Sequence, residues 1–506
     1  RNRVNRGQMK PGRDTSDSST QTESRTEAHF PRLSEVNLYT LLSLWMEMFP
    51  RKPPEDGDRD QVTRPSSLLV QPQPSAPSAP SGSASQVHET GLVVVRAGKV
   101  VGLHCSGPEL HAGQGAVLHH GGALAGCQLY FSRRPCATCL KMLINVGVSL
   151  ISFWPGDPEV SILVSASGGD AVEEVKLDAM ATKILKSNGR PHICVPLQPL
   201  VPGLAQFICE TSRACDFMET ALPKQPGRDP EELYNRQRIS HLNRFTRHFL
   251  VESPQQHQEM LRHMDLDSFC PDPCLWNLRN HMRELVEVLA SVVAGLPQPD
   301  YGFYREQCGS PEPSPPPHPG LSQDVARHCI IQARLLSYRT EDPKVGVGAV
   351  IWSKRQSAVC DGTGDLYLLG CGYNAYPTGS QYAEYPQLGS KQERARQRCK
   401  YRYIVHAEQN ALTFMNHPVK ADEASVMFVT KCPCDECVPL IRGAGITHIY
   451  TTDQDRDKNK GDISYLKFSG WKNISKFIWQ RSPSACAATS SSHQSKWEQT
   501  CATLTF

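Results

Sequence analysis

The sequence lacks any run of about 20 apolar residues, the length that a transmembrane helix needs. It also shows no basic region followed by an apolar core, the pattern of a secretory signal. We therefore expect no membrane partner. The formal charge is only +3, from 54 basic and 51 acidic residues, so no strong overall field draws the chain to nucleic acid or anionic lipid. Aromatic residues make up 7% of the chain, which offers little for base stacking and makes a nucleic-acid partner unexpected.

The 19 cysteines are odd in number and do not follow the spacing of a small disulfide scaffold. In a large chain this favours free thiols and metal ligands over disulfides, and therefore a reducing compartment. We expect a protein of the cytoplasm and nucleus. At 506 residues the chain exceeds what one hydrophobic core usually serves, so two or more domains are expected.

Proline-rich and polar stretches divide the chain. Residues 71–85 are rich in Pro, Ser and Ala, and residues 310–319 are rich in proline. Such segments bury too little apolar surface to fold and act as tails or connectors. We predict a largely disordered region over 1–88, a first domain with a helical extension over 89–300, a linker over 301–320, a second domain over 321–480 and a disordered tail over 481–506.

One apolar segment lies inside the polar N-terminal region. Residues 36–49 are too few for a membrane span but enough for a short helix. Within residues 38–46, the spacing of Leu38, Leu41, Leu44 and Met46 is that of a leucine-rich nuclear export signal, which would bind an export receptor and allow shuttling. The same spacing also suits a helix that packs on the protein itself, and the sequence leaves both interpretations open.

The chain contains an internal repeat. YFSRRPCATC at 130–139 aligns without gaps to FVTKCPCDEC at 428–437, and a glycine follows each copy at Gly147 or Gly445. Each copy predicts a strand, a Pro-Cys turn, a helix and a second strand. Helices that alternate with strands indicate an α/β fold, here two three-layer α/β/α sandwich domains.

The second copy completes a candidate zinc site. His406, Cys434 and Cys437 supply three protein ligands, the number at which a catalytic zinc keeps its fourth position for water. Glu408 follows the histidine by two residues and can carry protons as the catalytic residue. This H-x-E and P-C-x-x-C arrangement is the signature of zinc-dependent nucleobase deaminases. A closed zinc knuckle is the alternative, with Cys432 as the available fourth ligand.

The first copy keeps the metal ligands and loses the carboxylate. His111, Cys136 and Cys139 can hold a second zinc ion, but Gly113 stands where the proton carrier should be. We therefore expect the first domain to be catalytically silent and to serve structure, assembly or nucleotide sensing.

The second half, from about residue 321 to 452, resembles the deoxycytidylate deaminase branch of the cytidine deaminase superfamily. The resemblance rests on residues 342–350, 372–379 and 406–411 as well as on the metal motif. It implies the cytidine deaminase fold, an oligomeric assembly and a pyrimidine nucleoside or nucleotide substrate. It also implies substrate contacts from Asn374, Lys344 and Ala407.

A basic segment precedes the catalytic motif. Residues 391–402 carry six basic side chains in twelve positions, more than one phosphate requires. Because guanidinium groups pair with phosphate oxygens, the segment favours a nucleotide with one or three phosphates. A solvated helix face or a nuclear localisation patch would show the same composition. The candidate phosphate ligands are Arg394, Arg396, Arg398, Lys400 and Arg402.

These observations favour an enzyme that deaminates cytosine in deoxycytidine or its nucleotides, such as dCMP or dCTP. Two alternatives stay open. Paired deaminase domains with one inactive copy also occur in enzymes that edit polynucleotides, and the degenerate first copy also suits a non-catalytic interaction protein.

Overall fold

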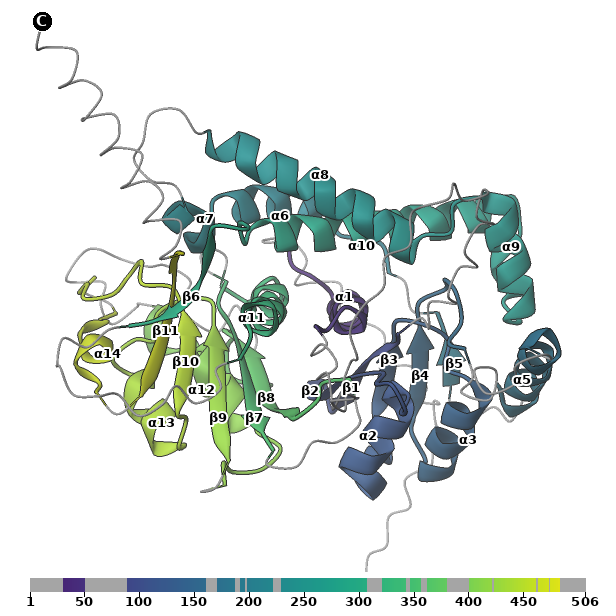
Figure 1. Cartoon of the computed structure of the whole chain (residues 1–506), viewed down its shortest axis with the longest axis horizontal. Helices are drawn as coiled ribbons and strands as arrows, with labels where there is room; N and C mark the ends of the chain where they lie inside the picture. The colour runs from purple at the N-terminus through teal and green to yellow at the C-terminus, as the bar shows by residue number, and fades with distance from the viewer. Residues whose placement is uncertain are drawn as a thin grey trace, which may run out of the picture.

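The computed structural model contains two β-sheets with helices packed around them (Figure 1). None of the helices that it describes combines the length and the apolar character needed to cross a membrane. The structure describes residues 31–50, 89–160, 171–186, 192–195, 198–221, 229–306, 321–342, 346–355, 362–379, 400–420, 423–460, 463–472 and 474–482.

The first sheet has the strand order β2-β1-β3-β4-β5. β1 (Gly91–Arg96) and β2 (Lys99–Cys105) form an antiparallel hairpin, whose tight turn places Ala97 and Gly98 at positive φ. β1 is also antiparallel to β3, and β3, β4 and β5 are parallel. The remaining elements of this domain are α2 (Ala112–His120), η1 (Gly121–Leu124), β3 (Gln128–Phe131), α3 (Ala137–Val146), β4 (Leu150–Phe153), α5 (Ala171–Lys186) and β5 (His192–Cys194).

The second sheet has the order β6-β11-β10-β9-β7-β8. Its elements are β6 (Tyr301–Arg305), α11 (Gln323–Ser337), β7 (Gly348–Lys354), β8 (Leu366–Tyr373), η5 (Lys400–Arg402), α12 (Ala407–Thr413), β9 (Ala424–Val429), α13 (Cys437–Gly443), β10 (His448–Thr451), α14 (Leu466–Gly470) and β11 (Ser475–Arg481).

Alternate residues of β7 face opposite layers, as the pleat of a strand requires. Val350 and Trp352 belong to the apolar cluster that contains α11. Ala349 and Ile351 belong to the cluster that contains α12 and α13. The second sheet is therefore the middle layer of an α/β/α sandwich, as the alternation of helices and strands predicts.

The helix α1 (Glu35–Glu47) is part of the folded core. It lies so close to β1 that a Cβ at Gly91 would be 2.0 Å from the Ser43 carbonyl oxygen. On its other side the Trp45 Nε1 group donates to the carbonyl of His328 in α11 at 2.9 Å. This helix therefore contacts the first sheet and the second domain together.

Burial of α1 corrects two expectations. Its apolar side chains are no more than 1% exposed at Leu38, Leu41, Leu44 and Met46. An export receptor cannot contact these side chains while the helix is packed, so the expected export signal is wrong for the folded chain. The structure shows the alternative, a helix that packs on the protein itself. The helix also belongs with the folded domains rather than with a separate region over 1–88, of which 1–30 and 51–88 lie outside the described residues.

The linker prediction is also partly wrong. Residues 301–305 form β6, which pairs antiparallel with β11 at the edge of the second sheet. Phe303 packs against Trp479 with ring centroids 5.1 Å apart. The aromatic side chains of this strand are buried, whereas those of a linker would be exposed to water. The strand therefore belongs to the second domain. The predicted linker residues 307–320 and tail residues 483–506 lie outside the described part of the chain.

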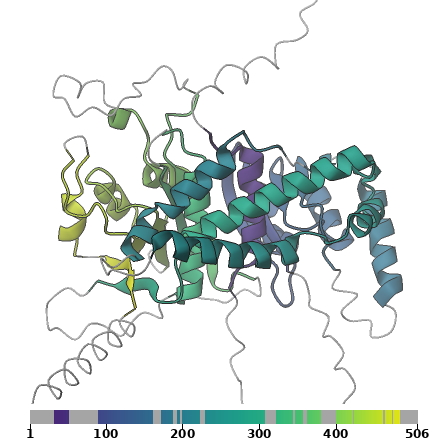
Figure 2. The same cartoon turned by 90° about the horizontal axis from the view of Figure 1, so that it is seen from above.

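A layer of helices joins the two sheets. Figure 2 shows α8 and α10 running across the molecule with α1 beneath them. The Trp154 Nε1 group of the first domain donates to the Phe249 carbonyl at the end of α8, and Trp479 Nε1 of the second sheet donates to the Phe217 carbonyl in α7. The layer consists of α6 (Leu204–Arg213), α7 (Asp216–Ala221), α8 (Pro230–Phe249), α9 (Pro254–His263), η2 (Asp267–Phe269) and α10 (Asp272–Ala294).

Candidate metal and active site

His406 occupies the N-cap position of α12, where its backbone is still extended. A hydrogen bond from its backbone N–H to Gln409 Oε1, at 2.8 Å, fixes the start of the helix. This capping arrangement leaves the imidazole directed at the turn after β9, which carries the two cysteines.

The predicted ligands come together as the sequence predicts. His406 Nδ1 lies 3.3 Å from the sulfur of Cys434 and 3.3 Å from that of Cys437. Three ligands around a tetrahedral zinc would place a nitrogen and a sulfur about 3.5 Å apart, given bonds of about 2.0 and 2.3 Å. One histidine and two cysteines are a donor set that zinc prefers, so these residues fit the ion. A hydrogen bond from the Cys437 thiol lowers the pKa of Cys434 to about 4, which favours the thiolate that a metal needs.

Glu408 lies beside this cluster without belonging to it. It is in the first turn of α12 and its side chain is buried. Burial raises the pKa of Glu408 to about 7, although the neighbouring His406 opposes the rise. A carboxyl group with a pKa near neutrality can both accept and donate a proton, which is what a general acid and base must do.

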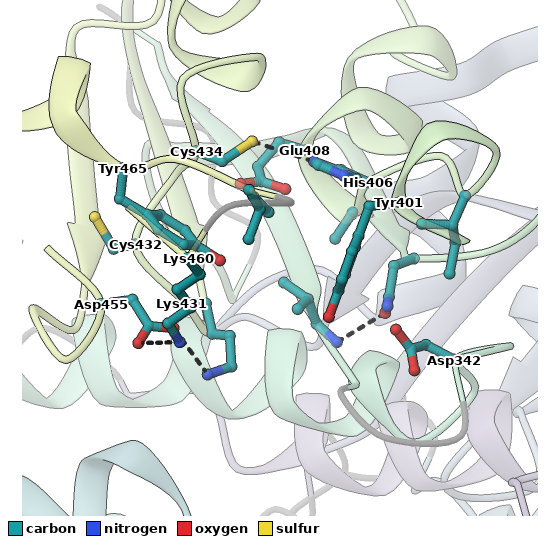
Figure 3. Close-up of a pocket in the computed structure, with 15 residues that line it drawn as sticks. Asp342, Tyr401, His406, Glu408, Lys431, Cys432, Cys434, Asp455, Lys460 and Tyr465 are labelled. Atoms are coloured by element: carbon teal, nitrogen blue, oxygen red, sulfur yellow. Dashed lines mark hydrogen bonds and ion pairs between the residues drawn. The ribbon is translucent and has the colours of Figure 1, made fainter. Parts of the chain in front are cut away.

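A cavity opens in front of these residues, and its walls enclose about 660 Å³ of empty space, open solvent included. Figure 3 shows Glu408, His406 and Cys434 at one end of it, with Asp455 and Lys431 at another. Its lining residues are Asp342, Val347, Asn374, Tyr401, Ile404, His406, Ala407, Glu408, Lys431, Cys432, Cys434, Asp455, Lys460, Ile463 and Tyr465.

Cys432 does not close the metal site. Its thiol is buried in the cavity wall and donates to the Pro433 carbonyl, and it is not a member of the His/Cys cluster. The arrangement therefore disfavours the closed knuckle and leaves the side of the cluster that faces the cavity to a water molecule or a ligand.

Two of the predicted substrate residues line the cavity, namely Asn374 and Ala407. Asn374 Oδ1 accepts hydrogen bonds from the Thr340 hydroxyl at 2.7 Å and from the Val347 backbone at 2.8 Å. Since both lone pairs of this oxygen are used within the protein, contact between the side chain and a ligand would come from the Nδ2 group.

The basic residues are only partly described. Lys344, Arg394, Arg396 and Arg398 lie outside the described residues, and of Lys400 only the backbone in η5 is described. Arg402 is exposed and does not line the cavity, in contrast to its neighbour Tyr401. The structure therefore brings the end of the basic segment to the edge of the cavity through Tyr401.

Sequence reasoning missed a charged group on the cavity wall. Asp455 accepts from Lys460 at 2.6 Å and lies 3.6 Å from Lys431, which also pairs with Asp216 of α7 at 3.0 Å. The internal repeat could have pointed to Lys431, because this lysine aligns with another basic residue, Arg133, in the first copy. Arg133 likewise forms an ion pair with a carboxylate, that of Glu47.

The second predicted cluster also forms. His111, Cys136 and Cys139 lie together in the first domain, where Gly113 follows His111 by two residues. A fourth buried residue, Glu159, joins this cluster, and sequence reasoning missed it.

The family model and the relatives found by sequence agree with the site. The model of the cytidine and deoxycytidylate deaminase zinc-binding region matches residues 323–452. The chain is 50% identical to a zebrafish (Danio rerio) protein named cytidine and dCMP deaminase domain-containing protein 1, over 92% of this chain and 93% of the relative. It is 31% identical to human deoxycytidylate deaminase, over 27% of this chain and 70% of the relative. Among solved structures, the apo dCMP deaminase of cyanophage S-TIM5 aligns over 31% of this chain and 97% of its own, with 19% identity and a TM-score of 0.21.

Proposed function

Since this chain belongs to the cytidine and deoxycytidylate deaminase family and is a deaminase of the hydrolase class, we propose that its second domain hydrolyses the cytosine amino group of a deoxycytidine nucleotide, releasing ammonia and leaving uracil. The observation that carries the proposal is the buried carboxyl of Glu408 beside the His406, Cys434 and Cys437 cluster, at the end of a cavity of about 660 Å³.

The metal ligands and Glu408 have different roles in the proposed reaction. Zinc held by His406, Cys434 and Cys437 would supply a Lewis acid that activates water at neutral pH. Glu408 takes a proton from the attacking water, passes it to the ring nitrogen of the base and then assists the departure of ammonia. Burial of Glu408 keeps this proton within the site between the steps.

The cavity favours a small substrate that carries phosphate. Lys431 and Lys460 contribute cationic groups to its wall, where Asp455 pairs with both of them, and Tyr401 connects the cavity to the basic segment over 391–402. Lysine and arginine side chains bind phosphate oxygens through charge-assisted hydrogen bonds. The substrate that best fits these features is a phosphorylated deoxynucleotide, dCMP or dCTP.

A substrate panel on the purified full chain tests this proposal. We expect catalytic efficiency to be at least about tenfold higher for dCMP or dCTP than for deoxycytidine, with uracil products measured by chromatography. Equal catalytic efficiency for deoxycytidine and its nucleotides would contradict the proposal that the substrate is a nucleotide. Conversion of cytosine within single-stranded DNA, faster than in free nucleotides, would instead support a polynucleotide-editing enzyme.

Assembly and location are proposed together with this function. We expect a homo-oligomer, to be checked by light scattering coupled to size-exclusion chromatography. We also expect the protein in cytoplasm and nucleus, to be checked by imaging of a tagged chain, because its 19 cysteines favour a reducing compartment.

A further inference from the structure

We propose that the first domain holds zinc in a closed site of four protein ligands, with Glu159 as the fourth ligand, and that this site stabilises the domain instead of catalysing a reaction. Glu159 lies in the loop that follows β4, 20 positions after Cys139 in the chain. Its side chain is only 1% exposed.

The distances from the histidine nitrogen to the other three donor atoms are those of a tetrahedral site, and all four donors lie within 4.8 Å of one another. His111 Nδ1 lies 3.2 Å from Glu159 Oε2, 3.3 Å from the Cys136 sulfur and 3.6 Å from the Cys139 sulfur. A tetrahedral zinc with bonds of about 2.0 Å to nitrogen and oxygen and about 2.3 Å to sulfur separates nitrogen from oxygen by about 3.3 Å and nitrogen from sulfur by about 3.5 Å. The observed set agrees with these values.

The carboxylate is held in place for this role. The backbone N–H of Cys136 donates to Glu159 Oε2 at 3.0 Å, which directs that oxygen to the cluster. The other oxygen, Oε1, is also buried. A buried carboxylate is costly unless it is paired with a cation, and coordination of a metal ion would offset that cost.

The two sites differ in whether a carboxylate follows the histidine by two residues. In the second domain, Glu408 follows the histidine by two residues, lines the cavity and stays outside the cluster. In the first domain, a Cβ at the matching Gly113 would lie 3.1 Å from the Cys139 Cβ and 3.2 Å from its sulfur. Cys139 therefore crowds the position of a catalytic carboxylate.

The corresponding loop of the second domain keeps its acid away from the metal. Asp455 follows β10 as Glu159 follows β4, but its carboxylate pairs with Lys431 and Lys460. The fourth position of the second cluster therefore faces the cavity, whereas Glu159 occupies it in the first. A site with four protein ligands has no position for a reactive water, and zinc in such sites contributes to folding.

Metal affinity and unfolding of the full chain test this assignment. We expect about two zinc ions per chain in the parent protein. Glu159→Gln should weaken binding of one ion at least about tenfold in a chelator competition and lower the thermal midpoint. Asp157→Asn is the matched control, since this half-exposed carboxylate lies in the same loop outside the cluster. Equal zinc affinity for Glu159→Gln and the parent would overturn the proposal.

A second measurement does not depend on the folding of Glu159→Gln. Cobalt is loaded into a Cys434→Ser/Cys437→Ser chain, in which only the first site binds metal, and the chain is titrated with azide. A closed site has no exchangeable position, so the visible bands of cobalt should not change. A saturable change in these bands would show an open fourth position and overturn the proposal.

Discussion

Lys431 Nζ in the cavity wall lies 3.0 Å from Asp216 Oδ2 of α7, a helix from outside the deaminase-like part of the chain. Asp455 contacts the same ammonium group at 3.6 Å from the other side. Burial opposes the charge on Lys431, but the two carboxylates outweigh it and raise the pKa of this lysine. The helical layer therefore places a carboxylate of α7 against a cation in the wall of the cavity.

Asp216→Asn should weaken substrate binding more than chemistry. Without the carboxylate, Lys431 keeps only Asp455 as a charged partner and loses its fixed position. We expect KM for the preferred nucleotide to rise about three- to tenfold with kcat within about twofold, measured by steady-state kinetics. Glu231→Gln serves as the control, because it removes an exposed ion pair with Arg213 in the same layer. Equal kinetics for both variants would contradict a role of Asp216 at the cavity.

Glu408→Gln should abolish turnover while the metal is retained. In the proposed reaction the side chain carries the proton, and it is not a member of the metal cluster. We expect kcat to fall by about 100-fold to 10,000-fold, the usual contribution of general acid and base catalysis, with unchanged zinc content. Glu436→Gln changes an exposed carboxylate next to the cluster and should keep its activity. Substantial turnover by Glu408→Gln would show that another group, or the first domain, performs the reaction.

Asn374→Asp tests the role of the side-chain Nδ2 group separately from that of Oδ1. The variant keeps an oxygen to accept from Thr340 and Val347 and replaces the Nδ2 group with a second oxygen. If Nδ2 donates to the substrate, kcat/KM should fall at least about tenfold while the thermal midpoint changes little. Thr340→Val removes the hydrogen bonds that the hydroxyl donates to Asn374 and accepts from the Asp342 backbone, and it leaves the amide, so it should affect stability more than kcat/KM. The opposite pattern would assign Asn374 a purely structural role.

Leu41→Ala tests whether α1 belongs to the core. Leu41 is 0% exposed between the first sheet and α11. Truncation of such a side chain should lower the free energy of unfolding by about 2–5 kcal/mol, as measured by urea denaturation. Leu118→Ala, at a position 66% exposed, should change it by less than about 0.5 kcal/mol. A negligible loss for Leu41→Ala would mean that the helix detaches easily and is free to bind a partner.

His328 should make the folded chain sensitive to acid. Burial lowers its pKa from 6.5 to about 3, so the folded state holds it neutral while the unfolded state binds a proton below pH 6.5. Its contribution to stability is present above pH 6.5 and is lost as the pH falls towards 3, at about 1.4 kcal/mol per pH unit.

His328→Phe keeps a ring against Trp45 and removes this titration. We expect the free energy of unfolding to depend less steeply on pH between 6 and 4.5 in this variant, measured by urea denaturation at several pH values. His263→Gln, at an exposed histidine, should retain the steep dependence of the parent. An unchanged slope in His328→Phe would show that other groups dominate the acid response.

Local sequence spacing determined the candidate metal cluster of the second domain and the carboxyl group beside it. His406 and Glu408 lie two residues apart at one helix start, and Cys434 and Cys437 lie in one turn, so short-range geometry decides where each of these side chains points. The internal repeat likewise determined that a second cluster forms around His111. These predictions needed only the periods of helices and strands and the ligand preference of zinc.

The tertiary structure alone decided which distant residues complete each site and which segments belong to the core. Glu159 reaches His111 only because β4 pairs beside β3, and Asp216 reaches Lys431 only because α7 packs against the second sheet. The apolar pattern of residues 38–46 was equally suited to a receptor and to the protein's own core. Its burial between two sheets settled that choice, because the free energy of packing depends on surfaces that lie far apart in the chain.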